Sequence, residues 1–322
     1  MTEHYVTLFD SVFLPQGLAL HYSLQEHGGD FLLWVLCLDD SCLQTLQRLN
    51  LPQVQLLDLK QLETAELLVV KPGRTRAEYC WTLSPWSIQW VFATDLTVQR
   101  VTYLDADVFF LKSPDSIFNE FEKSGCSVLI TEHGYAPEYD QTSTSGRYCV
   151  QFLPFVRGRG EPILHWWRDR CLEWCFNRCE NNLFGDQKYL EHFEHNFPGD
   201  VYSTGIDCRF QGPWNSNIFE FTDAVIFHFH GLRILSQGLL SLSNYSLPWT
   251  CLENVYKPYC KLLHSLTSQH YLPMMPQHRQ PPRKDMIKIF IKKWIKKKIF
   301  NDLQPHFFYK ETSVTGSQIW AE

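Results

Sequence analysis

Two aspartates one residue apart, Asp105 and Asp107, lie in the middle of the hydrophobic segment "VTYLDADVFFL" (101–111). Alternation along an extended strand places residues i and i+2 on the same face, so the two carboxylates point the same way. Unpaired buried carboxylates are very costly, and a cation or several hydrogen-bond donors must compensate them. Three interpretations fit the pair itself: a solvated strand end, a phosphatase nucleophile, or a site for a divalent metal ion.

The place of the pair in the chain helps to separate these interpretations. An apolar strand, D-x-D and a hydrophobic pair also form the nucleophile motif of haloacid-dehalogenase-type phosphatases, but that motif normally opens its fold. Here two strand–helix units come first. Such phosphatases also need a later acidic pair, and "FGDQKYL" offers only Asp186, with Leu190 where a second acid is expected. The sequence therefore favours the metal site and leaves the phosphatase as the weaker alternative.

The elements before the aspartates alternate between strand and helix patterns. Apolar runs at 5–9, 31–38 and 54–59 predict strands, and segments 15–28 and 41–50 predict helices. Repeats of this kind predict a parallel sheet with right-handed crossovers. Further along we expect a helix over 77–95 interrupted at Pro85, strands at 127–133 and 223–232, a helix over 161–180, and another that starts within 181–193.

Three motifs resemble one known family in their order and spacing. "YLDADVFFLKSPDSIF" is followed by "FGDQKYL" and then by "HFHGL", as in the family 8-type nucleotide-diphospho-sugar transferases. The resemblance covers residues 5 to 235. It implies an α/β protein of the GT-A class, with a mixed, mostly parallel, Rossmann-like sheet flanked by helices.

The resemblance also implies roles for several side chains. Asp105, Asp107 and His228 would hold Mn²⁺ or Mg²⁺, a donor set of hard oxygens and one imidazole that suits these ions. The diphosphate of the donor would lie on this ion and beside Asp105. Other expected roles are the nucleotide base for Asp10, the transferred sugar for Asp186 and Gln187, and the diphosphate for Gly231.

Further candidates come from the residues around these motifs. In an extended strand over 223–232, His228 and His230 share a face, so His230 is the fallback ligand or a substrate contact. Arg233 follows the H-x-x-G motif and is expected to serve the phosphates. Trp214, in "GPWNSN", is expected to stack on the acceptor sugar, or else to be a buried Trp in a turn. Arg74 and Arg76 are two unranked candidates for the donor.

The chain departs from the family pattern after the D-x-D loop. "YCVQF" (148–152) replaces the family's "Y-N-x-G", with Cys149 and Gln151 at the places of the Asn and the Gly. This departure keeps open a second function, a non-catalytic nucleotide-sugar or membrane-surface binding protein on the same fold. Cys171, Cys175 and Cys179 lack the usual spacing of a zinc site, so a packed thiol stripe on one helix is the favoured interpretation.

Bulk composition limits the classes of function. A net charge of −6 argues against nucleic-acid binding. We expect neither a signal peptide nor a transmembrane helix, because the basic region and long apolar runs that these need are missing from the sequence. The eleven cysteines lie mostly in apolar stretches, which is typical of reduced thiols and favours a cytoplasmic protein.

The segment 283–300 differs from the rest of the chain. "RKDMIKIFIKKWIKKKIF" places apolar residues on one helical face and lysines largely away from it. A basic amphipathic helix of this composition predicts peripheral attachment to an anionic membrane, here the inner face of the plasma membrane; the alternative is a helix packed on the domain. The predicted organisation is a transferase domain over 1–265, a Pro-rich linker over 266–284 and a basic tail over 285–322.

Taken together, the sequence predicts a metal-dependent hexosyltransferase. It would move a sugar from a nucleotide-diphosphate donor to a glycan or lipid-linked glycan of the cell surface, and the family resemblance implies retention of configuration.

Overall fold

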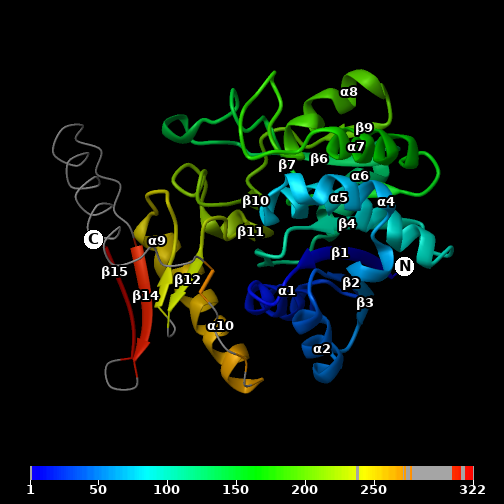
Figure 1. Cartoon of the computed structure of the whole chain (residues 1–322). Helices are drawn as coiled ribbons and strands as arrows, with labels where there is room; N and C mark the ends of the chain where they lie inside the picture. Colours follow the sequence, from blue (N-terminus) through cyan, green and yellow to red (C-terminus); the bar gives the residue numbers. More distant parts are fainter. Residues whose placement is uncertain are drawn as a thin grey trace. The chain divides into compact units, whose positions relative to one another are not determined.

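The structure is a computed structural model, which describes residues 2–236, 239–270, 272, 276–277, 307–312 and 316–321. The chain divides into two compact units, Met1–His228 and Phe229–Glu322 (Figure 1). The boundary falls inside the range 1–265, for which the sequence predicts one transferase domain. That functional assignment stays a prediction, and each unit is described by itself below.

The first unit begins with the predicted strand–helix repeats. They are β1 (Glu3–Phe9), α1 (Leu14–His27), β2 (Phe31–Cys37), α2 (Asp40–Leu49) and β3 (Val54–Asp58). β2 pairs in parallel with both β1 and β3. Local signals account for these elements: Pro15 lies in the first turn of α1, and the Asp39 carboxylate caps α2 by accepting a hydrogen bond from Cys42 N at 2.8 Å.

Short helices then lead to a long one. α3 (Leu59–Leu62), α4 (Ala65–Val70) and the 3₁₀ turn η1 (Lys71–Gly73) precede α5 (Arg76–Thr94). A capping box starts α5: Glu78 N donates to Thr75 Oγ1, and Thr75 N donates to the Glu78 carboxylate. The predicted interruption at Pro85 is wrong, because α5 runs through it while its length packs on β1 and β4.

The strand β4 (Arg100–Leu104) lies beside β1, on the side away from β2. The strand order therefore reverses between β1 and β4, which are parallel to each other. The carboxyl ends of these two strands flank this topological switch point. Ligands of open α/β sheets bind at such a crevice. Asp10 follows β1 and Asp105 follows β4, so the topology brings the first two predicted site residues to the same edge.

The rest of the main sheet is mostly antiparallel. It continues through β8 (Phe152–Val156), β6 (Val128–Glu132) and β7 (Tyr148–Cys149), in the order β3-β2-β1-β4-β8-β6-β7, with β9 (Val201–Ser203) parallel to β6. Figure 1 shows α1 and α2 on one face of the sheet and α5 and α7 (Glu161–Glu173) on the other. The predicted mixed α/β architecture is confirmed.

A small second sheet lies next to the aspartates. It has the order β10 (Phe210–Gln211), β11 (Ile226–His228), β5 (Val108–Phe110). β11 and β5 are antiparallel, and their register pairs His228 with Val108. This pairing joins the late histidine to the residue that directly follows Asp107.

Two predicted helices are shorter than expected. α7 ends at Glu173, where Trp174 adopts an extended backbone, so Cys175 and Cys179 do not continue a stripe on its face. Cys171 and Cys175 are buried, Cys179 is exposed, and all eleven cysteines, each in the described part of the chain, are free thiols. The segment after Asp186 forms a 3₁₀ turn, η3 (Gln187–His192), and a short helix, α8 (Phe193–Asn196).

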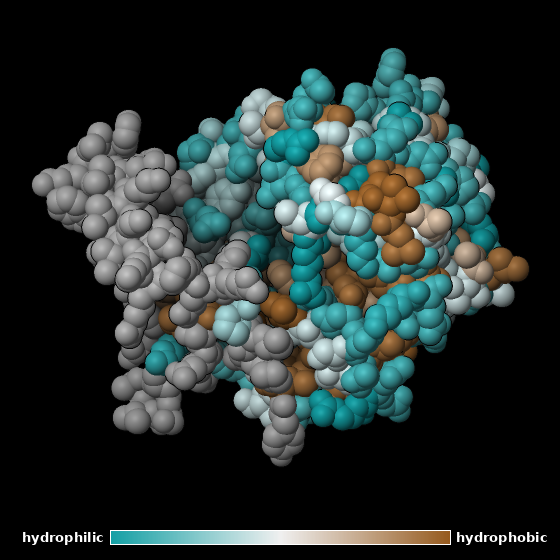
Figure 2. Space-filling view, viewed as in Figure 1, coloured by the Kyte–Doolittle hydropathy of each residue, from teal (hydrophilic) through white to brown (hydrophobic). Residues whose placement is uncertain are grey.

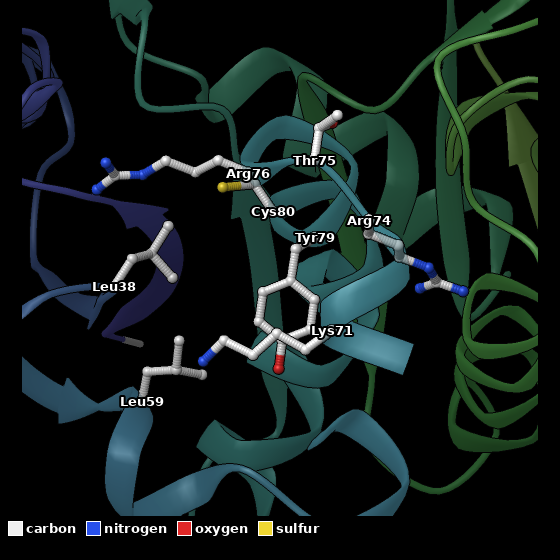
Figure 3. Close-up of a pocket in the computed structure, with 8 residues that line it drawn as sticks. All are labelled: Leu38, Leu59, Lys71, Arg74, Thr75, Arg76, Tyr79 and Cys80. Atoms are coloured by element: carbon white, nitrogen blue, oxygen red, sulfur yellow. The ribbon is translucent and has the colours of Figure 1, made fainter. Parts of the chain in front are cut away.

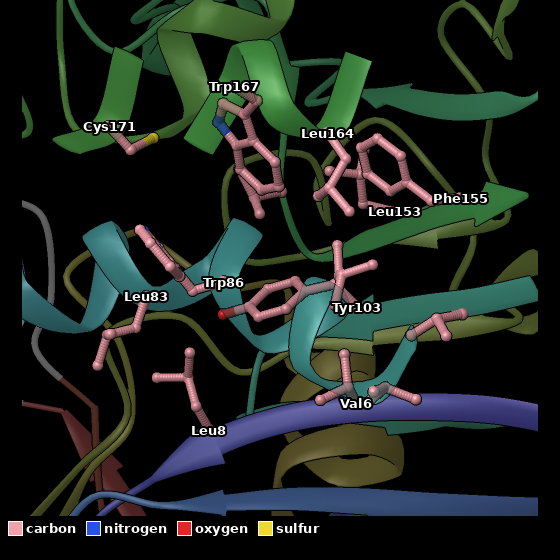
Figure 4. Packing of buried hydrophobic residues seen from close by; sticks show 14 of the residues in the cluster. Val6, Leu8, Leu83, Trp86, Tyr103, Leu153, Phe155, Leu164, Trp167 and Cys171 are labelled. Atoms are coloured by element: carbon pink, nitrogen blue, oxygen red, sulfur yellow. The ribbon is translucent and has the colours of Figure 1, made fainter. Parts of the chain in front are cut away.

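The main core fills the space between the sheet, α5 and α7 (Figure 4). Trp167 of α7 is fully buried and its ring stacks on Phe155 of β8, with centroids 6.1 Å apart. Burying one such side chain stabilises the fold by about 2–3 kcal/mol. This layer packs α5 on β4 and α7 on β8, and it holds the two helices against each other.

The surface view shows mainly polar side chains (Figure 2). A brown apolar patch lies where Figure 1 labels α4, and Leu68 and Val69 of that helix are 52% and 79% exposed. No helix among the described residues is long and apolar enough to cross a membrane.

The second unit contains a four-stranded antiparallel sheet and a helical segment. Its elements are β12 (Arg233–Ser236), β13 (Leu239–Ser241), α9 (Trp249–Cys251), the π-helical η5 (Leu252–Tyr256), α10 (Lys257–Gln269), β14 (Phe307–Thr312) and β15 (Gly316–Ala321). The Phe229 ring stacks on Tyr259 of α10 at 3.6 Å. α10 extends four residues into the predicted linker, and the basic segment 283–300 lies outside the described residues.

Candidate functional site

Asp105 and Asp107 lie in a tight turn between β4 and β5. Val108 N donates to the Asp105 carbonyl at 3.2 Å, which closes the turn. The extended backbone that the alternation argument assumes is interrupted at the pair, because β4 and β5 belong to different sheets. The turn nevertheless directs both carboxylates toward one partner, His228.

His228 is the residue that brings the site together. Its Nε2 lies 3.0 Å from Asp107 Oδ1 and 3.8 Å from Asp105 Oδ2. The side chain is 7% exposed, so the contacts form in a largely desolvated place. The predicted association of the aspartate pair with this late histidine is thus seen in the geometry.

The charged groups at this turn shift the pKa values of one another. Burial lowers the pKa of His228, but the nearby Asp107 carboxylate, with Cys149 and Asp105, outweighs it and raises that pKa well above its usual value. Burial and the neighbouring Asp107 charge raise the pKa of Asp105, and His228 opposes this rise. The histidine thus partly compensates the two like charges, as a buried pair requires.

Other side chains hold the imidazole on its remaining sides. Gln151 Oε1 lies 3.2 Å from His228 Nδ1, and the Cys149 sulfur forms a hydrogen bond with the same ring. Trp214 packs edge-to-face on the imidazole, with centroids 5.4 Å apart. The sequence marked Cys149 and Gln151 only as departures from the family pattern. Their spacing in "YCVQF" gives no signal of a contact so distant along the chain.

Trp214 itself is 3% exposed, and its Nε1 donates to the His133 carbonyl at 2.7 Å. Of the two interpretations of "GPWNSN", the structure supports the buried Trp in a turn. The expected stacking of Trp214 on an acceptor sugar is not supported, because the ring is used to pack His228.

Asp186 lies at the other end of a hydrogen-bonded chain that leads to the aspartate pair. Ser84 Oγ donates to Asp186 Oδ2 at 2.8 Å and lies 3.4 Å from Tyr103 OH, which donates to Asp105 Oδ1 at 3.1 Å. Burial raises the pKa of Asp186 to about 7; the Ser84 hydrogen bond opposes this rise and the Asp105 charge adds to it. Asp186 therefore belongs to the same electrostatic site, through Ser84 and Tyr103, which sequence reasoning missed.

Residues that follow Asp186 fix a loop between β6 and β7. Gln187 Nε2 donates to the Ser145 carbonyl at 2.6 Å, and the buried Lys188 donates through Nζ to the Ser143 carbonyl at 2.9 Å. Arg147 N in turn donates to the Glu191 carboxylate at 2.9 Å. The predicted "DQ" pair thus combines a buried acid with an amide that anchors this loop.

Asp10 forms a second charged cluster at the ends of β1 and β2. Its Oδ2 lies 2.6 Å from Arg76 Nε, and its Oδ1 accepts hydrogen bonds from the backbone of Val12 and Phe13. Arg76 also contacts Asp39 Oδ2 at 3.0 Å. Burial raises the pKa of Asp39, but hydrogen bonds from Cys42 and Ser11, together with Arg76, reverse this and lower it.

This cluster borders a pocket of about 250 Å³ at the start of α5. The lining residues come from the ends of β2 and β3 and from the segment that enters α5, and are Leu38, Leu59, Lys71, Arg74, Thr75, Arg76, Tyr79 and Cys80 (Figure 3). Figure 3 shows Arg76 directed toward the blue strands and Arg74 directed the opposite way. Arg74 donates to the Leu172 carbonyl at 2.6 Å, so Arg76 is the better of the two donor candidates.

The last three predicted residues belong to the second unit. β11 ends at His228, so the predicted strand that places His228 and His230 on one face is wrong; His230 is exposed. Gly231 has a φ of +82°, a conformation that suits glycine. Arg233 Nη1 donates to the Leu232 carbonyl at 2.7 Å. Their roles toward the donor stay predictions.

Asp105, Asp107 and His228 have the types of side chain that bind a divalent cation. Two carboxylates and an imidazole suit Mn²⁺ or Mg²⁺, and adjacent ligands of an octahedral ion lie about 3 Å apart. The 3.0 Å between His228 Nε2 and Asp107 Oδ1 matches that spacing, whereas the 3.8 Å to Asp105 is wider. Within the described ranges, no group of three or more His, Cys, Asp or Glu residues is already arranged to hold a metal ion. Asp105 would have to move closer to complete such a site.

Comparison with solved structures identifies the fold. The chain is similar to the galactosyltransferase LgtC, solved in complex with donor and acceptor sugar analogues, with 12% identity, a TM-score of 0.50, and coverage of 88% of this chain and 99% of that one. This similarity confirms the expected GT-A glycosyltransferase fold.

Sequence comparison gives the family. The chain is 33% identical to the uncharacterized protein YfnF of Bacillus subtilis (strain 168) over 258 residues, 73% of this chain and 84% of that protein. It is 28% identical to the uncharacterized protein YfnD of the same organism over 285 residues, 80% and 88% of the two chains. No protein-family model matches the chain. The chain belongs to the same family as YfnF.

Proposed function

We propose that the protein is a metal-dependent glycosyltransferase that takes a nucleotide-diphosphate sugar as donor. The observation that carries this proposal is the convergence of Asp105, Asp107 and His228 beside the switch point of a GT-A sheet. That crevice is where ligands of open α/β folds bind. The residues fit Mn²⁺ or Mg²⁺, and such an ion supplies a Lewis acid for the charge that develops on the leaving diphosphate.

The two charged clusters would divide the donor between them. Asp10 and Arg76 present a carboxylate and a guanidinium at the pocket before α5, groups suited to the polar edge of a nucleobase and to ribose hydroxyls. Asp105 and Asp107 follow the neighbouring strand β4 and would receive the diphosphate end through the ion. The adjacency of β1 and β4 supports this division.

Asp186 and Gln187 would lie beside the transferred sugar. Asp186 is buried, with its pKa raised to about 7, so near neutral pH it is present in both protonated and ionised forms. A carboxyl group in that state can donate a hydrogen bond to a sugar hydroxyl or accept one from it. Retention of configuration at the sugar is proposed from the family resemblance alone.

The proposed acceptor is a glycan or lipid-linked glycan, and the basic segment 283–300 is proposed to attach the protein to an anionic membrane on the cytoplasmic side. Support for the attachment comes from its sequence, with apolar residues on one helical face and lysines on the other. Deletion of the chain after Pro282 should abolish sedimentation with vesicles that contain phosphatidylglycerol. Equal sedimentation of the truncated protein would refute the attachment.

One assay tests the activity and separates its alternatives. The protein is incubated with Mn²⁺ and each of a panel of nucleotide sugars, with and without glycan acceptors, and nucleoside diphosphate release is measured. We expect release with one sugar donor, and its loss in Asp107→Ala. Binding of a nucleotide sugar without turnover would support the non-catalytic protein, and hydrolysis of phosphate monoesters alone would support a phosphatase.

A further inference from the structure

Gln151 lies on the side of His228 that faces away from the aspartate pair. It falls between β7 and β8 and is fully buried, and its Oε1 lies 3.2 Å from His228 Nδ1. The other amide atom, Nε2, is also buried and has no hydrogen-bond partner among the described residues. Buried polar groups are normally hydrogen bonded, so the orientation of this amide needs a reason. Its NH₂ group is unpaired, whereas its oxygen is directed at the imidazole of His228.

The two nitrogens of His228 have different neighbours, and this difference matters for a cation. Nε2 faces Asp105 and Asp107, whereas Nδ1 faces Gln151. Only a ring nitrogen without a proton can ligate a metal ion, and the hydrogen bond at the other nitrogen decides which one that is. When Nδ1–H donates to Gln151 Oε1, the lone pair of Nε2 is directed at the aspartates. With the proton on Nε2, that nitrogen would instead donate to Asp107 at 3.0 Å.

We infer that Gln151 is a positioning residue that holds the proton of His228 on Nδ1 and thereby keeps Nε2 available for a divalent cation. The inference rests on the proposed function, because it presumes that the aspartates and His228 bind such an ion. It goes beyond the family resemblance, since Gln151 stands where that family has a glycine, which has no side chain to offer.

The surroundings of Gln151 support this role. The Gln151 backbone N–H donates to the Cys149 sulfur, and that sulfur forms a hydrogen bond with His228. Cys149 and Gln151, which lie where β7 leads into β8, thus both contact the His228 ring. The Trp214 ring packs edge-to-face with the imidazole, with centroids 5.4 Å apart, and limits its rotation.

The experiment measures binding of Mn²⁺ alone, from the EPR signal of the free ion, to the full-length protein. Gln151→Met keeps a side chain of similar size but removes the acceptor, and it should weaken Mn²⁺ binding about 10- to 100-fold, as loss of such outer partners does. Gln151→Glu keeps the acceptor and should bind Mn²⁺ within a few-fold of the wild type. Gln16→Met is the matched control and should leave binding unchanged. Gln16 is buried in α1, and neither of its amide atoms has a hydrogen-bond partner in the part of the chain that the structure describes.

A second measurement does not depend on the variants folding. ¹⁵N NMR of histidine-labelled wild-type protein, saturated with diamagnetic Mg²⁺, should show His228 protonated at Nδ1 and bare at Nε2. A proton on Nε2, or wild-type Mn²⁺ affinity in a folded Gln151→Met protein, would overturn the inference.

These outcomes can be told apart from failure of the proposed function. If the wild type binds no Mn²⁺, or if Asp107→Asn binds it as well as the wild type, the metal site itself is wrong and the inference falls with it. If the wild type binds Mn²⁺, Asp107→Asn does not, and Gln151→Met still does, only the role of Gln151 is wrong.

Discussion

The two acidic clusters of the first unit, Asp10 with Asp39 and Asp105 with Asp107, are compensated in different ways. Between Asp10 and Asp39 lies Arg76, whose charge is permanent, at 2.6 and 3.0 Å. Between Asp105 and Asp107 lies His228, whose charge depends on a single proton. The first cluster therefore keeps its compensating charge. The second loses its compensation when the histidine gives up that proton, and then two carboxylates and an imidazole lone pair remain for a divalent ion.

Exposure separates the clusters further. The Arg76 side chain is 59% exposed, whereas that of His228 is 7% exposed. The carboxylates are similarly exposed in the two clusters, at 8% for Asp10 and 29% for Asp39 against 30% for Asp105 and 16% for Asp107. Water therefore reaches the cation of the first cluster and weakens its ion pairs. The His228 imidazole of the second cluster is shielded from water, so its charge acts more strongly on the two aspartates. The cluster of Asp10, which has an exposed cation, and the cluster of Asp105, which has a buried one, thus follow the adjacent strands β1 and β4.

The largest expected effect is at the buried cluster. Asp107→Asn removes one proposed cation ligand and should lower kcat/KM by about 100- to 1,000-fold, because the charge on the leaving diphosphate loses its main stabilisation. Mn²⁺ titration should show a parallel loss of affinity. Asp39→Asn is the comparison variant from the other cluster and should retain Mn²⁺ affinity; equal losses in both variants would remove the distinction between the clusters.

The stability of the protein should depend on pH through Asp186, which is linked to the buried cluster of Asp105 and Asp107. Its pKa is raised to about 7 in the folded protein, from 3.8 for an ordinary aspartate. The folded state therefore binds the proton more tightly, and the free energy of unfolding falls as pH rises from about 4 to about 7. Asp186→Asn does not titrate, so between about pH 5 and about pH 8 its stability relative to the wild type should rise by about 1–3 kcal/mol.

Urea unfolding of Asp186→Asn and wild type at the two pH values measures this shift. Asp39→Asn supplies the contrast, because the pKa of Asp39 is lowered rather than raised. A stability difference between Asp186→Asn and wild type that stays constant with pH would contradict the raised pKa.

Arg76 should influence donor binding without influencing the metal. Arg76→Gln removes a charged hydrogen-bond donor from the pocket and should raise KM for the nucleotide sugar about 10-fold. Steady-state kinetics at saturating Mn²⁺ provides the measurement, and the Mn²⁺ affinity should stay that of the wild type. Arg74→Gln should not reproduce this effect on KM. Arg74 donates to the Leu172 carbonyl, so its loss should reduce the stability of the protein instead.

The smallest effect concerns the capping box that presents Arg76. Thr75→Ala removes the cap of α5 and should reduce the free energy of unfolding by about 1 kcal/mol. Thr64→Ala, at the cap of the six-residue α4, should cost less, because α4 buries only Leu67 whereas α5 is buried along much of its length. Thermal unfolding of both variants tests this order.

Sequence reasoning succeeded where the signal is local. Alternating apolar runs predicted the first strands and helices, because the signals that form these elements, such as Pro15 in the first turn of α1, act within a few residues. It failed at element ends: the strand through 223–232 stops at His228, and Gly231 shortly afterwards takes a left-handed conformation that no apolar pattern encodes.

The site divides in the same way. The D-x-D pair, His228 and Asp186 were predicted because their motifs are recognisable along the chain. Gln151, Ser84 and the Arg76–Asp39 contact were not, because each joins segments that only the folded sheet brings together. For Trp214 the sequence left two roles open, since composition alone cannot tell a ring that packs a histidine from one that faces a sugar.

The loop between β6 and β7 has a consequence for how this protein can evolve. Gln187 and Lys188 hold the backbone carbonyls of Ser145 and Ser143, and these two anchors directly follow Asp186. An insertion or deletion between Tyr139 and Arg147 would displace those carbonyls and shift the neighbouring acid with them. Descendants that acquire new specificity should therefore change the amino acids of this loop far more readily than its length.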